Sequence, residues 1–211
     1  MLDSVEAIKD FVIRGKRKEA VEEASKAIAA GADAAVIMKE GLIGAMSVVG
    51  QKFSSGEFFL PQMMIAARAM TEVIPVIKPY LVGEAAAKRG KAVIGTVQGD
   101  FHDIGKNIVK MMLEGAGYEV VDLGVDVTAE KFVDAVRRES PDFLLMSALI
   151  TLTMESARRT IGAVDAAGLR GNVRIGVGGA PLTQKFADEI GADFYGADAY
   201  ACVETCNRLV H

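Results

Sequence analysis

The feature that most limits the fold of this chain is a change in hydrophobic period near residue 90. After Gly90, short apolar runs rich in β-branched residues alternate with longer stretches of helical period. Such alternation predicts parallel strands joined by crossover helices, which build an α/β fold with a doubly wound sheet. The expected strands are residues 91–97, 118–123, 143–147, 173–177 and 193–195, and the expected helices are 104–113, 129–138, 153–167 and 181–190.

Residues 1 to about 88 contain no convincing strand, and their apolar residues recur at helical spacing over Val5–Val12 and Ala20–Ile28. A break at Gly31-Ala32-Asp33 precedes a third helix that ends near Phe53, and Pro61 suits the first turn of a fourth. Short connections favour a four-helix bundle. We therefore expect two domains: a helical bundle over residues 1–88 and a five-stranded, Rossmann- or flavodoxin-like domain over 89–211.

Charge and composition exclude several classes of protein. The net charge of −4 and the lack of a basic stripe with interleaved aromatics argue against a nucleic-acid partner. The longest apolar stretches, Gly41–Gly50 and Leu144–Met154, are too short for a membrane span, and the N-terminus lacks a signal core. We expect a cytoplasmic protein. Cys202 and Cys206, the only cysteines, suit small core residues of a last helix better than a disulfide or zinc site.

The chain contains two histidines, one of which is the C-terminal residue His211. The other, His102, lies in the loop after the first strand, at the edge of the sheet where doubly wound folds bind ligands. Asp100 precedes it by two residues, so the two side chains face the same side of an extended segment. The carboxylate can accept the N–H of one ring nitrogen and leave the other nitrogen free to bind a metal.

Other interpretations of this loop remain open at this point. A lone histidine in a loop is more often a solvated residue than a ligand. Zinc would need three or four protein ligands, which nothing in the sequence supplies. The segment fails the phosphate-loop motif in its spacing and at Asn107, and it lacks G-x-G-x-x-G. A metal already held by a macrocycle fits better, because it needs only one ligand from the protein.

Asp100-x-His102-x-x-Gly105 resembles the D-x-H-x-x-G signature of cobalamin-binding domains. That family also has an S-x-L after the third strand and a G-G after the fourth. Ser147-Ala148-Leu149 and Gly178-Gly179 occupy those places. Taken alone, the glycine pair reads equally well as a turn after a strand. Its register with the other two motifs favours the cobalamin site.

The resemblance implies that a histidine replaces the cofactor's own benzimidazole on cobalt, the base-off, His-on state. The expected catalytic residues are His102 as axial cobalt ligand, Asp100 as its carboxylate partner and Thr153 as a hydroxyl that extends the relay. The displaced nucleotide tail would run down a slot in the sheet, lined by Ser147 and packed by Leu149. The other expected cofactor contacts are Gln98, Gly99, Phe101, Asp103, Ile104, Gly105, Ile150, Thr151, Gly178, Gly179, Ala180 and Pro181.

Residues 53–63 (FSSGEFFLPQM) resemble the helical cap of cobalamin-dependent methionine synthase and of stand-alone methyl-carrier corrinoid proteins. By that match, Phe53, Leu60 and Met63 would cover the upper, methyl-bearing face of the corrin and shield its Co–CH₃ bond. The alternative interpretation of the same residues is a core rich in methionine and phenylalanine. Gly83–Gly90, which is polar with glycine at both ends, is the expected hinge that lets the cap move aside.

The resemblance implies a methyl carrier whose cofactor is cobalamin or methylcobalamin. No homocysteine, folate or activation domain fits into 211 residues, so the chain would borrow its chemistry from partners. The expected partners are a substrate:corrinoid methyltransferase, a corrinoid:tetrahydrofolate or corrinoid:thiol methyltransferase, and a reductive activase. The alternatives are a cobalamin-binding regulator or sensor, for which no basic recognition helix is present, and an interaction domain without cofactor.

Overall fold

The computed structural model describes residues 2–81 and 89–210, which divide into two compact units. One unit is Met1–Lys88 with Gly115–Gly117, and the other is Arg89–Glu114 with Tyr118–His211. Of the expected hinge, Gly83–Gly90, residues 83–88 lie outside the described part of the chain.

The first unit contains the expected helical bundle. It comprises α1 (Leu2–Ile13), α2 (Arg17–Ala29), the run α3 (Ala34–Val36), η1 (Ile37–Ile43) and α4 (Gly44–Ser54), then α5 (Leu60–Ile77) and the short turn η2 (Lys78–Tyr80). Pro61 stands in the first turn of α5, as predicted. Helix α1 packs against α2, α4 and α5, and α2 packs against α5. Fully buried side chains in this core include Ile8, Val12, Ile37, Leu42, Val49, Met63 and Val73.

The third helix of the bundle differs from the expectation in two ways. Its central segment, Ile37–Ile43, is a π-helix, a wide turn that hydrophobic period alone does not reveal. The helix also runs unbroken over Ala34–Ser54, so its 21 residues are long and apolar enough to cross a membrane. The sequence-based estimate had considered only the most apolar part of this helix, Gly41–Gly50. One such helix is weak evidence for a membrane, since a core helix passes the same test.

The second unit contains the five-stranded parallel sheet. Its strands are β1 (Lys91–Thr96), β2 (Glu119–Asp122), β3 (Phe143–Ser147), β4 (Arg174–Gly178) and β5 (Phe194–Gly196). Each lies within one or two residues of its expected position, and the strand order is β2-β1-β3-β4-β5. This is the flavodoxin-like order, whose chain reverses direction across the sheet between β1 and β3. The expectation of a doubly wound sheet is confirmed.

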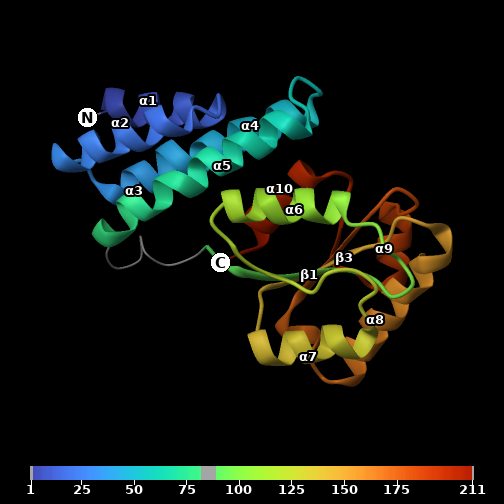
Figure 1. The fold of residues 1–211 in the computed structure, drawn as a ribbon. Helices are drawn as coiled ribbons and strands as arrows, with labels where there is room; N and C mark the ends of the chain where they lie inside the picture. Colours follow the sequence, from blue (N-terminus) through green and yellow to red (C-terminus); the bar gives the residue numbers. More distant parts are fainter. Residues whose placement is uncertain (1, 82–88, 211) are drawn as a thin grey trace. The chain divides into compact units, whose positions relative to one another are not determined.

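Helices cover both faces of the sheet (Figure 1). Helices α6 (Ile104–Gly115) and α10 (Ala199–Leu209) lie on one face, and α7 (Ala129–Glu139), α8 (Met154–Ala166) and α9 (Gln184–Ile190) lie on the other. Short turns η4 (Thr151–Thr153) and η5 (Arg170–Asn172) complete the unit. Helix α9 begins three residues later than expected, because Thr183 caps it by accepting the Phe186 N–H at 3.2 Å.

Candidate functional site

The loop after β1 lies at the switch point of the sheet. Side chains of other segments hold it in place through hydrogen bonds with its backbone groups. Gly99 has a φ of +84°, in the region that favours glycine, and its N–H donates to the Asp126 carboxylate at 2.8 Å. The Thr96 hydroxyl donates to the His102 carbonyl at 2.9 Å. The loop buries the side chain of Asp100 completely and leaves that of His102 53% exposed.

The expected partners Asp100 and His102 are in direct contact. Carboxylate Oδ1 of Asp100 lies 2.7 Å from Nδ1 of the His102 ring and also accepts the backbone N–H of His102 at 3.1 Å. The extended spacing of two residues therefore brings both groups to one side, as the sequence predicted.

The second oxygen of Asp100 ties this loop to the loop after β3. Oδ2 accepts the Leu149 N–H at 2.6 Å and the Thr153 hydroxyl at 2.8 Å. Burial would raise the pKa of Asp100, but hydrogen bonds from Leu149, His102 and Thr153 outweigh it and hold the pKa well below its usual range. An ionised carboxylate only accepts hydrogen bonds, so the His102 proton belongs on Nδ1 and the lone pair of Nε2 is free.

Large apolar side chains are exposed on the same two loops. Phe101 and Ile104 follow β1, and Leu149, Ile150 and Leu152 follow β3. Leu152, at 88%, is the most exposed of these five. Apolar residues gathered beside one polar ligand are typical of a binding site for a large, mostly apolar cofactor. Leu152 was not among the residues expected from the sequence.

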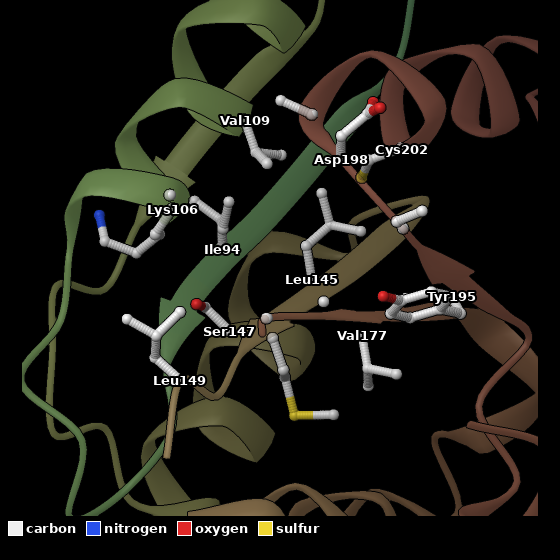
Figure 2. A pocket seen from close by; sticks show the side chains of 18 of the residues that line it. Ile94, Lys106, Val109, Leu145, Ser147, Leu149, Val177, Tyr195, Asp198 and Cys202 are labelled. Carbon is white, nitrogen blue, oxygen red and sulfur yellow. The ribbon is translucent and has the colours of Figure 1, made fainter. Parts of the chain in front are cut away.

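An open cavity of about 340 Å³ extends from these loops across the sheet face that α6 and α10 cover (Figure 2). It is lined by Gly105 of α6, by Ser147 and Leu149 at the end of β3, and by Gly178 and Gly179 at the end of β4. The three sequence motifs therefore contribute residues to one cavity, although together they span more than 70 positions of the chain. Ala180, at the turn after β4, lines it as well.

The residues around the cavity fit a ligand that fills it. A Cβ on Gly178 would lie 3.1 Å from the Gly196 carbonyl oxygen, so a side chain there would close the slot. Gly105 lines the cavity, and a Cβ there would meet open space, with nothing within 4 Å beyond its chain neighbours and its own helix backbone. Among residues 2–81 and 89–210, no group of three His, Cys, Asp or Glu side chains could hold a metal ion. A metal at His102 would have to bring its other ligands with it.

Lys106 has a structural partner rather than a free ammonium group. Its side chain is 2% exposed, and Nζ lies 2.7 and 2.8 Å from the two oxygens of Asp122 and 2.7 Å from Oδ1 of Asn107. Burial raises the pKa of Asp122, but Lys106 and the Gly124 N–H lower it overall. This buried pair fastens the start of α6 to the end of β2, which supports the interpretation that Gly105-Lys106 is no phosphate loop.

The remaining residues expected at the site are distributed as follows. Gln98, Asp103 and Thr151 are exposed on the loops around His102, and Pro181 is half-buried after β4. In the helical unit, Phe53 and Leu60 are half-buried, whereas the side chain of Met63 is fully buried. The contacts of all these residues with a cofactor stay predictions.

Sequence reasoning missed the far part of the cavity. Ile94, Val109, Leu145, Gly176, Tyr195 and Cys202 also line it. Cys202 is 7% exposed, in agreement with its expected role as a small core residue. Its position in the cavity wall was not predicted from the sequence. A usable signal was present in the strands, because Ile94 and Leu145 face the same side as Thr96 and Ser147 at the strand ends.

Fold and site together define an α/β protein that presents one oriented imidazole beside an open cavity, an arrangement suited to a large flat cofactor with its own metal. Comparison with known families agrees: a B12 binding domain matches residues 90–204, and a second B12 binding domain matches residues 5–78. Trimethylamine corrinoid protein 2 of Methanosarcina acetivorans is 42% identical over 204 residues, which cover 96% of this chain and 94% of that protein. Dimethylamine corrinoid protein 1 of the same organism is 42% identical over 195 residues, 92% of each chain.

Two solved structures are similar over almost the whole chain. A cobalamin-binding protein from Desulfitobacterium hafniense has a TM-score of 0.81 at 34% identity and covers 100% of this chain and 98% of its own. The methanol:cobalamin methyltransferase complex from Methanosarcina barkeri contains a chain with a TM-score of 0.86 at 32% identity, covering 99% of this chain and 80% of its own. The protein belongs to the family of B12-binding corrinoid proteins of methyltransferase systems, and its cofactor is a cobalamin-type corrinoid. The expected fold, family and cofactor are confirmed.

Gly105→Val is expected to leave the free energy of unfolding within about 0.5 kcal/mol of the parent, since its side chain would meet no protein atom. The same side chain would occupy cofactor space, and overpacking of 1–3 kcal/mol corresponds to roughly 5- to 150-fold weaker corrinoid binding. Gly162→Val in α8 is the matched control, because a Cβ there also meets nothing within 4 Å and the position lies off the cavity. Urea denaturation and absorbance titration measure the two quantities. Equal corrinoid affinity in both variants would contradict the prediction.

Proposed function

We propose that this protein carries a methyl group on corrinoid cobalt between two partner enzymes. One partner is a substrate:corrinoid methyltransferase and the other a corrinoid:tetrahydrofolate or corrinoid:thiol methyltransferase. The single observation that carries the proposal is the geometry of His102, whose Nδ1 lies 2.7 Å from the buried carboxylate of Asp100 while the ring remains half exposed. When bound, the corrinoid supplies a cobalt centre that can accept a methyl group and release it.

The chain's own residues would hold the corrinoid in the base-off, His-on state. Asp100 would keep the proton of His102 on Nδ1, so that Nε2 could hold the cobalt of a bound corrinoid. Thr153 and the Leu149 N–H keep Asp100 ionised and fixed in position. The displaced nucleotide tail would enter the cavity past Ser147, Gly178 and Gly179.

The two units have separate roles in this proposal, with residues 1–88 as the cap domain and 89–211 as the cofactor domain. Phe53 and Leu60 would shield the upper face of the corrin from water. Met63, which is fully buried, would then support these two residues from within the bundle or turn outward on binding. In this proposal both partners reach the same upper face of the corrin.

Methylated amines are the donor class to test first. The relatives at 42–43% identity are named as trimethylamine and dimethylamine corrinoid proteins, whereas the chain from the methanol:cobalamin methyltransferase complex is 32% identical. A reductive activase would restore cobalt that has been oxidised accidentally. We place these partners and the protein in the cytoplasm.

Electron paramagnetic resonance of the protein reconstituted with hydroxocobalamin and reduced to Co(II) tests the axial ligand directly. With ¹⁵N-labelled histidine, the nitrogen splitting of the cobalt signal should change from the ¹⁴N to the ¹⁵N pattern. A benzimidazole ligand carries no label, so its splitting would stay unchanged.

His102→Ala should abolish this histidine-dependent splitting, while His211→Ala, the matched control at the only other histidine, should retain it. In a separate sample reduced further to Co(I) with a chemical reductant, addition of a methylamine:corrinoid methyltransferase with its amine should transfer the methyl group to the cofactor and release the demethylated amine, as followed by visible absorbance. The assignment of His102 as axial ligand would be overturned if the nitrogen splitting were the same with ¹⁴N- and ¹⁵N-histidine, or if it persisted in His102→Ala.

A further inference from the structure

The cavity beside His102 has two levels, which follow from the register of the strands that form its floor. At the outer level, Ser147 pairs with Gly178, which pairs with Gly196. At the inner level, two residues earlier in each strand, Ile94 pairs with Leu145, which pairs with Gly176. Two residues of strand correspond to about 6.6 Å, so the inner level lies one aromatic ring deeper than the outer one.

Two helices wall the inner level. Val109 of α6 stands about one turn after Gly105, and Cys202 of α10 stands about one turn after its cap, Asp198. Both side chains border the cavity (Figure 2). A Cβ on Gly196 would lie 3.0 Å from the Cβ of Cys202, so the glycine lets α10 pack closely against β5 at this end of the slot.

The two levels differ in chemistry. The outer level offers the Ser147 hydroxyl, and the exposed cap Asp198 stands near its rim. The inner level offers hydrocarbon from Ile94, Leu145 and Val109 and the weakly polar thiol of Cys202. Lys106 also lines the cavity, but Asp122 and Asn107 hold its ammonium group. Tyr195, which pairs with Val177 between the two levels, and Asp198 also line the cavity and bring a hydroxyl and a carboxylate to it. The side chains of the inner level itself provide no charged group or hydroxyl to a ligand.

We infer that the inner level selects the lower base of the corrinoid, and that it favours a base with a hydrocarbon edge, such as a methylated benzimidazole, over an amino-purine. This inference rests on the proposed base-off binding, in which the tail enters the cavity. The exocyclic amine of a purine would lose its water and find no partner among these side chains. A dimethylbenzimidazole would bury its two methyl groups against Ile94, Leu145 and Val109.

The test compares three probes: cobalamin with its dimethylbenzimidazole, the analogue with adenine as lower base, and cobinamide, which has no nucleotide tail. The parent protein should bind cobalamin at least about tenfold more tightly than the adenine analogue. One methylene group in a hydrophobic pocket already changes affinity by roughly 10-fold or more. Equal affinity, or tighter binding of the adenine analogue, would overturn the inference.

Variants locate the effect at the inner level. Val109→Thr adds a hydroxyl without changing shape and should reduce the cobalamin preference at least threefold, whereas Val133→Thr, a half-buried valine of α7 away from the cavity, should not. Cys202→Leu should weaken both tailed corrinoids and leave cobinamide unchanged. An unaltered preference in Val109→Thr would overturn the inference even if Cys202→Leu fails to fold.

Cobinamide separates this inference from the proposed function. If cobinamide binds with a His102-dependent signal while the tail preference is absent, the axial ligand stands and only the selection of the lower base is wrong. If neither cobinamide nor cobalamin binds, the proposed function fails and the inference fails with it.

Discussion

Replacing Asp100 by asparagine is expected to weaken corrinoid binding by about 10- to 100-fold, the usual cost of losing the partner of a metal-binding histidine. The effect should be accompanied by loss of histidine nitrogen splitting on Co(II). Absorbance titration with hydroxocobalamin measures the first quantity, and paramagnetic resonance measures the second.

The physical reason is the number of donors that meet at one carboxylate. Asp100 accepts from His102 twice, from Leu149 and from Thr153. Asparagine has one acceptor oxygen, so its amide NH₂ must face one pair of these donors. If it faces His102, the ring accepts through Nδ1 and carries its proton on Nε2, where it blocks the cobalt. If the NH₂ faces Leu149 instead, it meets the Leu149 N–H, which is also a donor, and the two groups repel each other.

Thr153→Val is the matched control for Asp100→Asn. It removes one hydrogen bond to Oδ2 and should cost about 1 kcal/mol of stability, while the contact of Asp100 with His102 remains. The histidine splitting should persist in this variant. If Asp100→Asn kept both the parent affinity and the splitting, the carboxylate would not determine the tautomer of His102.

Most of the sheet and the Asp100–His102 pair could be predicted because they depend on residues that are close in the sequence. Strand runs end at loops whose residues are few and chemically distinctive, and His102 is the only histidine apart from the last residue. Its contact with Asp100 depends only on an extended spacing of two residues. The link from Asp100 to Leu149 spans 49 positions and depends on the strand order, which periodicity does not reveal.

The inner part of the cavity could not be predicted for a related reason. Ile94 and Leu145 look like ordinary core residues, and their place on the cavity wall depends on how helices and loops pack over the strand ends. Cys202 reaches this space because α10 returns over the same face as α6. Met63 is fully buried, and its expected contact with the corrin stays a prediction.

Gly179→Ala is expected to lower the free energy of unfolding by about 3 kcal/mol or more, because strain and steric overlap add at this position. Gly179 has a φ of +137°, and a Cβ there would lie 1.8 Å from the Ala148 carbonyl oxygen. The Ala148 oxygen belongs to the backbone, and the position of a Cβ is fixed by the backbone that carries it, so no rotamer change can relieve the overlap. Urea denaturation with an unchanged m-value measures the loss.

Gly191→Ala is the control that separates the two contributions. Gly191 also has a positive φ, +77°, but a Cβ there would meet nothing within 4 Å, so only the backbone strain of about 1 kcal/mol should appear. The overlap at Gly179 should also move Ala148 and with it the Leu149 N–H that binds Asp100, so corrinoid affinity should fall together with stability. If Gly179→Ala and Gly191→Ala lost equal stability, the loop after β3 would be able to move away from the new Cβ at little cost. Gly178-Gly179 would then serve only as a turn.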